Sequence, residues 1–533
     1  MTGLNLAGRG TSSQGRAGLA AIGISVAATF AVAVAGPSTM EPVLPGRPGQ
    51  PPWAFDLHRY LPDHVGDYLS VGFTAFALAA GALGLFLTLR AMRAGWTIPA
   101  RPLLLAGLAT AVLLTLVPPF GSSDPLSYAA YGRMLVTGHN PYLTKPLQLI
   151  NLGDPVAKAV QDWRNQSSVY GPLATGIQGL ASLIAGPSAR LTVFLLDLAN
   201  LVAFAGTALL LHWMTRGRPD RQLRSALLWT ANPLLLQVLV AGGHVDVQMI
   251  VFCVAAVAVL YGAGEPTVPR AAAAGLLTGL GFGVKVTAAL VGLGLAAALA
   301  AALWRRRDRL LPLLVALAAG FAVPAAVSLA IGGSAMLKDT SQASDMVSIG
   351  SPWRVIRTGL EHAVGYHPAT DIVRAGAVVL AVILVIITAV VLARAMPASA
   401  QQITPAEGVV PAQGVTPAQG VSPARGVTPA VSTPGLLPLA LVLGWLLAWP
   451  YVLPWYDALG WAFLALVPAT QADWLLLIRT SVLGFAYLPA RTYGVHMPPG
   501  LSWLQPVIRN GIAPVVLAAE VVWLILMMSW RSP

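Results

Sequence analysis

Apolar stretches of about 20 residues recur along nearly the whole chain and are separated by short polar segments. Each is long enough to cross a bilayer as an α-helix, which satisfies all of its own backbone polar groups. The pattern predicts an all-α, polytopic membrane protein with about 12 to 14 transmembrane helices and both ends inside. The expected spans are Ala17–Gly36, Tyr68–Leu89, Pro102–Pro119, Leu191–Met214, Ser225–Ala241, Val247–Gly262, Ala271–Lys285, Thr287–Leu303, Leu310–Ile331, Ile372–Ala393, Gly435–Pro450, Ala458–Ala469, Trp474–Leu488 and Gly511–Trp530.

The first apolar stretch, within residues 1–36, also has features of a secretory signal peptide. Arg9 and Arg16 precede it, and Ala33-Val34-Ala35 imitates a small-residue cleavage site. Its apolar run of about 20 residues is longer than a usual signal core. We therefore expect an uncleaved transmembrane helix that acts as a signal anchor.

Three apolar segments are shorter than a full span: Ala271–Lys285, Ala458–Ala469 and an additional segment, Leu173–Gly186. Backbone that enters a bilayer without crossing it is stable only where protein buries it or where it lines a cavity. We expect some of these segments to be re-entrant or half-membrane helices.

Arginines gather in three of the short connections between spans. Because basic residues in short loops stay in the cytoplasm, these connections set the orientation. The segments 37–67, 120–171 and 332–371 then become long outer loops. The arginines are Arg90, Arg93 and Arg101; Arg216, Arg218, Arg221 and Arg224; and Arg305, Arg306, Arg307 and Arg309.

Residues 394–434 separate a membrane module over 37–393 from C-terminal transmembrane helices over 435–533. Prolines recur every six residues from Pro405 to Pro429, with glycines between them. A left-handed β-helix also has a six-residue period, but about five repeats are too few to stack. We expect a disordered cytoplasmic Pro/Gly linker.

Composition narrows the functional classes. Hydrophobic residues make up 56% of the chain, charged residues 10%, and the mean hydropathy is +0.71, which excludes a soluble protein. The net charge of +12 belongs to no basic soluble module, so we expect no nucleic-acid partner. Cys253 is the only cysteine, which excludes an intrachain disulfide and a cysteine-based metal site.

The most informative polar stretch follows the third span directly and begins with Asp124. Since Pro125 comes next, Asp124 has an alternative role as a helix cap. However, hydroxyl, cationic and aromatic groups beside one carboxylate suit a sugar, and an inverting glycosyl transfer needs a carboxylate that accepts the proton of the attacking hydroxyl. The accompanying candidates for substrate binding are Tyr128, Tyr131, Arg133, His139 and Tyr142.

Two further groups could meet an anion. His244 and Asp246 follow two glycines at an outward-facing tip; they are too few to assign a metal site, and a plain polar turn is the alternative. Lys285 stands in an otherwise apolar stretch, where an ionisable side chain needs a partner. A lipid phosphate would serve, and snorkelling to the membrane surface is the alternative.

The last candidates are Trp455 and Tyr456, which lie in a proline-containing outer loop, and Arg491 in the next outer loop. The two aromatic residues suit stacking on a sugar ring or a prenyl chain. The alternative is the general aromatic belt of membrane proteins.

Four motifs together resemble one known family. They are Ser123-Asp124-Pro-Leu-Ser-Tyr-Ala-Ala-Tyr131-Gly-Arg133 through Gly138-His-Asn-Pro-Tyr142, Gly243-His-Val-Asp246, Val284-Lys285 and Tyr451-Val-Leu-Pro-Trp-Tyr456. The chain is similar, from about Tyr68 to its C-terminus, to the polyprenol-phosphomannose-dependent alpha-1,6-mannosyltransferases of actinobacteria. These are membrane glycosyltransferases of the GT-C superfamily. The repeat over 404–430 looks like an insertion, and Val245 stands where the resemblance leads us to expect Asn.

The resemblance implies transfer of mannose, with inversion, from polyprenyl-phosphate-mannose to a mannan or lipoglycan acceptor at the outer face of the bacterial plasma membrane. It places the general base on Asp124. Phosphate binding falls on Lys285, His244 or Arg491, which the sequence does not rank. We assign no cofactor and leave a metal requirement open. A lipid-linked-sugar flippase or another membrane transporter is the alternative, although we find no repeated set of helices of the kind that transporters show.

Overall fold

The computed structural model describes residues 2–35, 38–42, 44–45, 52–55, 66–262, 264–348, 350–395, 435–451, 453–490 and 499–529. Within these ranges the chain is helical and has no strand. Seven segments are long and apolar enough to cross a membrane, by length and composition, and shorter apolar helices accompany them. The predicted all-α, polytopic fold is confirmed. The seven segments are Thr11–Ala35, Asp67–Arg93, Ala189–Met214, Pro219–Ala241, Arg307–Gln342, Tyr366–Arg394 and Pro499–Met528.

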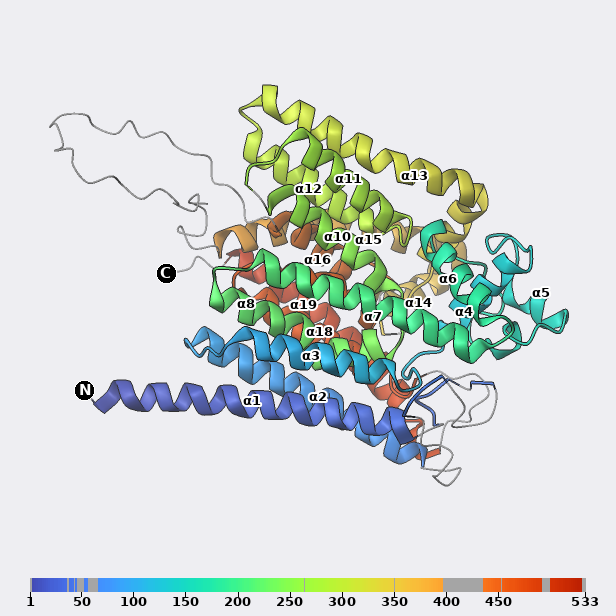
Figure 1. Cartoon of the computed structure of the whole chain (residues 1–533), viewed down its shortest axis with the longest axis horizontal. Coiled ribbons are helices and arrows are strands. Elements are labelled where there is room, and N and C mark those ends of the chain that lie inside the picture. Colours follow the sequence, from blue (N-terminus) through green and yellow to red (C-terminus); the bar gives the residue numbers. More distant parts are fainter. Residues whose placement is uncertain are drawn as a thin grey trace.

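The bundle is elongated along the helix axes and therefore has two ends (Figure 1). At one end, on the right of the figure, lie α4 (Asp124–Val136), α5 (Pro146–Asn151) and α6 (Pro172–Ala185). We call this the site end. At the other end lies α8 (Pro219–Ser225), which carries arginines predicted to be cytoplasmic. We call this the arginine end.

Small residues let neighbouring helices approach closely. In α2 (Asp67–Arg93), a Cβ added at Gly84 would stand 2.8 Å from the backbone nitrogen of Ile22 in α1 (Thr2–Ala35). Such contacts between small residues are typical of helix packing in membranes, where dispersion replaces the hydrophobic effect between helices.

The expected outer loops 120–171 and 332–371 are partly helical. α4 and α5 occupy the first, and in the second α13 (Arg307–Ser344) continues past its expected end, bends at Gly333 and is followed by α14 (Pro352–Val364). Short helices with polar faces carry no apolar run of spanning length, which is why the hydrophobic pattern did not reveal them. The start of α14 is standard, since Ser351 caps it and Pro352 occupies its first turn.

The expected span Ser225–Ala241 is not one regular helix. Two π-helical segments, η3 (Ala226–Thr230) and η4 (Leu236–Ala241), flank the short α9 (Pro233–Leu235). Pro233 has no backbone N–H and restarts the helix, while the Asn232 side chain accepts the N–H of Leu234. The other short segments become α6, α11 (Val268–Phe282) and the eight-residue α17 (Asp457–Leu464).

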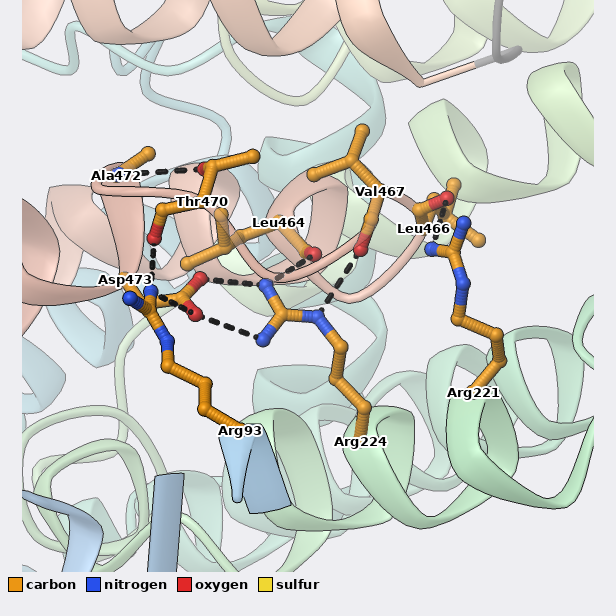
Figure 2. Close-up of polar contacts among 9 residues, drawn as sticks. All are labelled: Arg93, Arg221, Arg224, Leu464, Leu466, Val467, Thr470, Ala472 and Asp473. Carbon is orange, nitrogen blue, oxygen red and sulfur yellow. Dashed lines mark hydrogen bonds and ion pairs between the residues drawn. The ribbon is translucent and has the colours of Figure 1, made fainter. Parts of the chain in front are cut away.

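Buried polar contacts join N-terminal and C-terminal helices at the arginine end (Figure 2). Arg224 of α8 donates from Nη1 to Oδ2 of Asp473 at 3.0 Å, and Arg93 at the end of α2 donates to the same oxygen at 2.9 Å. Arg224 also donates to the carbonyl oxygens of Leu464 and Val467, where α17 ends. Two guanidinium groups thus satisfy a buried carboxylate and a helix terminus. We call Arg93, Arg224 and Asp473 the arginine junction.

The remaining helices complete the bundle around one apolar core that includes side chains from Ile22 in α1 to Leu524 in the last helix. Their bounds are α3 (Ala100–Thr115), η2 (Ala157–Ala159), α7 (Ala189–Met214), α10 (Asp246–Tyr261), α12 (Ala288–Leu303), α15 (Tyr366–Arg394), α16 (Leu436–Ala448), η6 (Pro454–Tyr456), α18 (Ala472–Ala486), η7 (Pro499–Leu501), η8 (Gln505–Ile512) and α19 (Ala513–Ser529). The expected linker over 394–434 lies almost entirely outside the described residues.

Candidate active site

Asp124 is the first residue of α4, at the site end. The segment before it is fixed because Phe120 donates its backbone N–H to the carbonyl of Ala241 at 2.9 Å. The N-cap position belongs to Ser123, and Pro125 occupies the first turn. The Asp124 carboxylate therefore is not the N-cap group of α4 and bonds elsewhere.

The two carboxylate oxygens of Asp124 have different partners. Oδ1 accepts a hydrogen bond from the indole Nε1 of Trp163 at 3.1 Å. Oδ2 has only long contacts, to the hydroxyl of Tyr128 at 3.5 Å and to Nδ1 of His244 at 3.7 Å. The side chain is 14% exposed. Oδ1 is thus fixed by a hydrogen bond, and Oδ2 retains the capacity to accept a proton.

Burial raises the pKa of Asp124 to about 6. The hydrogen bond from Trp163 works against this shift by stabilising the charged form, while the nearby carboxylate of Asp162 adds to it. A carboxyl group with a pKa close to neutrality is suited to exchange protons with a substrate hydroxyl.

A left-handed turn brings His244 to Asp124. Gly243 has φ of 65°, and a Cβ there would stand 2.9 Å from Pro125 of α4, so both the conformation and the close approach require glycine. The His244 ring stacks on Trp455 with centroids 3.6 Å apart. Burial, and then the charge of Lys285, hold the pKa of His244 well below its usual range. The imidazole is therefore neutral.

Lys285 lies in the turn between α11 and α12 and is paired. Its Nζ lies 2.7 Å from Oδ1 of Asp246 and 3.8 Å from the ring centroid of Tyr456. The structure therefore brings three of the predicted motifs together from distant parts of the chain. Because Asp246 already neutralises Lys285 in part, an incoming phosphate would share this cation with a carboxylate.

A cavity of about 570 Å³ opens beside Asp124. Of the predicted site residues that the structure describes, Asp124 alone lines it; His244 and Trp455 line a much smaller cavity nearby. The large cavity joins the α4 region to the C-terminal half of the chain. Its charged and aromatic lining residues are Asp124, Asp162, Trp163, Asp345, Arg357, Tyr366, Tyr451, Tyr487 and Arg509.

Four predicted residues do not line this cavity, and three of them tie the outer segment to itself or to α6. Arg133 pairs with Asp154 at 2.7 Å, and Tyr131 donates to the carbonyl of Gln166 at 3.0 Å. His139 contacts Thr137 at an exposed position, and the Tyr142 hydroxyl lies 3.1 Å from Oγ1 of Thr175. Arg491 lies outside the described residues.

Several residues at the site went unnoticed in the sequence. Asp162 and Trp163 lie within the expected outer segment but belong to no motif, and Tyr170 reaches the site through the Tyr128 hydroxyl at 3.4 Å. Arg357 of α14 and Arg509 of η8 line the cavity from the C-terminal half. Only their chemical type, polar or aromatic in an expected outer or terminal segment, could have drawn attention to them.

In the part of the chain that the structure describes, no group of three or more His, Cys, Asp or Glu side chains could hold a metal ion. The cluster at Asp124 consists of carboxylates, one neutral imidazole, phenols and an indole. We assign no metal ligand among these residues.

Fold and site together define a polytopic membrane protein with an acidic residue at a cavity near one end of its helices. The family described as "Alpha-(1->6)-mannopyranosyltransferase, N-terminal domain" matches residues 20–304, more than half of the chain. The chain belongs to this family, as its motifs predicted.

Individual relatives match over shorter stretches. Alpha-(1->6)-mannopyranosyltransferase A of Corynebacterium glutamicum is 25% identical over 142 residues, which are 27% of this chain and 29% of that protein. An alpha-(1->6)-mannopyranosyltransferase of Mycobacterium tuberculosis is 31% identical over 142 residues, 26% of this chain and 23% of that protein. The chain thus matches less than a third of the length of either relative. Arg357 and Arg509 lie beyond the residues that the family match covers.

Proposed function

We propose that this protein is a membrane glycosyltransferase that transfers mannose from polyprenyl-phosphate-mannose to a mannan or lipomannan acceptor in alpha-1,6 linkage. The observation that carries the proposal is Asp124, a nearly buried carboxylate with one under-occupied oxygen at the edge of a large cavity. Membership of an alpha-1,6-mannopyranosyltransferase family supports it.

In the proposed reaction the 6-hydroxyl of the acceptor sugar attacks the anomeric carbon of the donor mannose. The new carbon–oxygen bond forms as the bond to the phosphate oxygen breaks, and the lipid phosphate leaves with the electron pair. Asp124 accepts the hydroxyl proton. Attack opposite the leaving group inverts a beta-linked donor to an alpha-linked product.

The donor phosphate needs a cation near the anomeric carbon. The sequence offered Lys285, His244 and Arg491; of these, His244 is neutral and Lys285 is paired with Asp246. Arg357 and Arg509 extend this set, because they line the same cavity as Asp124. We keep Lys285 as the first candidate because it lies close enough to Asp124 to influence its charge, and Arg509 as the second.

We place the reaction on the extracytoplasmic face of the plasma membrane. The support is the separation of the two ends of the bundle: Asp124 lies at the site end and the arginine clusters at the other. Arginines in short loops are retained in the cytoplasm.

Radiolabelled mannose transfer in membranes from a deletion strain tests the activity. With the wild-type protein added back, right-side-out vesicles given polyprenyl-phosphate-mannose should label a mannan that an alpha-1,6-mannosidase digests. A nucleotide-linked mannose given to the same vesicles should label nothing. Labelling without this protein, or from the nucleotide donor alone, would contradict the proposal.

A further inference from the structure

Trp163 has an unusual backbone conformation. Its φ is 64°, and it is the one non-glycine residue with positive φ in the described ranges. A bulky side chain in the left-handed region is disfavoured and persists only where surrounding contacts impose it. Such outliers gather at functional sites, which makes Trp163 a residue to explain.

The neighbours of Trp163 are tied down on both sides. Oδ2 of Asp162 accepts a hydrogen bond from Ser123 Oγ at 2.8 Å, and the carbonyl of Arg164 accepts the N–H of Leu147 at 2.8 Å. These contacts anchor the strained residue to α4 and α5. The conformation is therefore built into the fold rather than left to a free loop.

The Trp163 side chain contacts Asp124 and also borders the cavity. Its indole N–H donates to Oδ1 of Asp124, and its ring lines the cavity while remaining 37% exposed. A half-exposed tryptophan at the wall of a cavity presents apolar ring surface to whatever occupies it. A sugar ring is apolar on the face where its C–H groups point.

We propose that Trp163 is a positioning residue: its N–H holds Oδ1 of Asp124 so that Oδ2 meets the acceptor hydroxyl, and its ring stacks on the acceptor mannose. This inference rests on the proposed function. It explains why strain is retained at this position, because a relaxed backbone would turn the indole away from Asp124.

Two substitutions separate the two roles. Trp163→Phe keeps an aromatic ring and removes the N–H, and Trp163→Leu removes both. In purified protein given polyprenyl-phosphate-mannose and a synthetic alpha-1,6-dimannoside, Trp163→Phe should lower kcat about tenfold, since a hydrogen bond to a charged group is lost. It should leave the acceptor KM within about twofold of wild type because the ring remains. Trp163→Leu should in addition raise the acceptor KM severalfold.

The pH profile distinguishes positioning from general damage. The Trp163 N–H favours ionised Asp124, so its loss should move the acid limb of kcat upward by about 1 pH unit. Trp353→Phe is the matched control: it removes an indole hydrogen bond to the Ala448 carbonyl at 2.7 Å, away from the cavity lining, and should leave the acid limb in place. If Trp163→Phe aggregates, Trp163→Gly replaces it, because glycine adopts the left-handed backbone without strain. Trp163→Gly should also have a lowered kcat.

A wild-type kcat and an unmoved acid limb in Trp163→Phe would overturn the positioning role, and equal acceptor KM values in the Phe and Leu variants would overturn the stacking role. Asp124→Asn is measured beside them. If that variant is inactive while Trp163→Phe behaves as wild type, only this inference fails. If Asp124→Asn turns over normally, the proposed function fails instead.

Discussion

Two aspartates, each in the first turn of a helix, lie at opposite ends of the bundle and are bonded in opposite ways. Asp473 at the arginine end is fully buried and accepts hydrogen bonds from Arg93 and Arg224 (Figure 2). Asp124 at the site end borders a cavity and is bonded at normal length by one neutral donor, Trp163. Both carboxylate oxygens of Asp473 accept hydrogen bonds from guanidinium groups, whereas Oδ2 of Asp124 has only long contacts.

The two carboxylates differ in charge partners and in unfilled hydrogen-bonding capacity. Two guanidinium groups bond both carboxylate oxygens of Asp473. Burial without a directly bonded cation raises the pKa of Asp124, and the long contacts of Oδ2 leave it available. Burial alone therefore does not distinguish a candidate catalytic acid from a structural one; unfilled bonding capacity beside a cavity makes Asp124 the candidate.

The largest expected effect is on turnover in Asp124→Asn. An amide cannot accept the hydroxyl proton, so kcat should fall about a hundred- to ten-thousand-fold. The Trp163 N–H can still donate to the amide oxygen, so the fold should be kept. Purified Asp124→Asn should elute as a monodisperse peak and bind the donor; normal turnover would return Asp124 to a structural role.

Arg224→Met should lower the stability that the arginine junction provides around Asp473. It leaves Asp473 buried with one of its two cations missing, which costs about 3 to 5 kcal/mol of stability. Thermal unfolding in detergent should show the loss, while the folded fraction keeps its kcat. Arg221→Met is the control. Arg221 lies in the same helix as Arg224 and donates a long hydrogen bond, 3.4 Å, to the Leu466 carbonyl rather than to Asp473. Equal melting temperatures for both variants would contradict a stabilising role of the arginine junction.

A smaller effect is expected at Lys285. Lys285→Met removes a cation close to Asp124 and should raise the apparent donor KM about tenfold, with little change in acceptor KM. Because Asp246 would lose its partner, the double variant Lys285→Met, Asp246→Leu serves as the control for damage to the fold. Unchanged donor kinetics in both would leave Lys285 a structural role, and Arg509→Met would then be the variant to raise the donor KM.

The smallest effect is in the pH dependence. In the proposed reaction the ionised form of Asp124 is the base, and burial raises its pKa to about 6, so activity should fall as the pH drops through about 6 and reach half of its plateau there. Steady-state rates between pH 5 and pH 8, with enzyme stability checked at each pH, measure this. A flat profile across pH 6 would contradict the assignment of Asp124 as the base.

Much of the fold followed from the hydrophobic pattern because spanning helices need long apolar runs. The elements that this pattern did not predict have identifiable physical causes. α4, α5 and α14 are helices without such a run, and Pro233 interrupts a stretch that reads as one span. The sequence pattern records hydrophobic length, and it does not record how a cap or a proline divides an element.

The candidate site was predictable where its chemistry is local. Asp124 stands in a motif, and Lys285, His244 and Asp246 each stand out as polar residues beside apolar spans. That Lys285 pairs with Asp246 is a contact between the turn after α11 and the start of α10, 39 residues apart in sequence, so spacing alone could not predict it. The role of Trp163 depends on a backbone angle and on one hydrogen bond, and neither leaves a trace in the sequence.

The cavity also has a consequence for biosynthesis. Asp124 is made early, whereas Arg357 and Arg509, which complete the cavity wall, are made later, with Arg509 following after roughly 20 to 80 seconds of translation. During that interval Asp124 is already present without the residues of the C-terminal half that line the cavity beside it. Under the proposed function, the growing chain has no complete cavity in which to bind a lipid-linked sugar, and we expect activity to begin only when the last helices have docked.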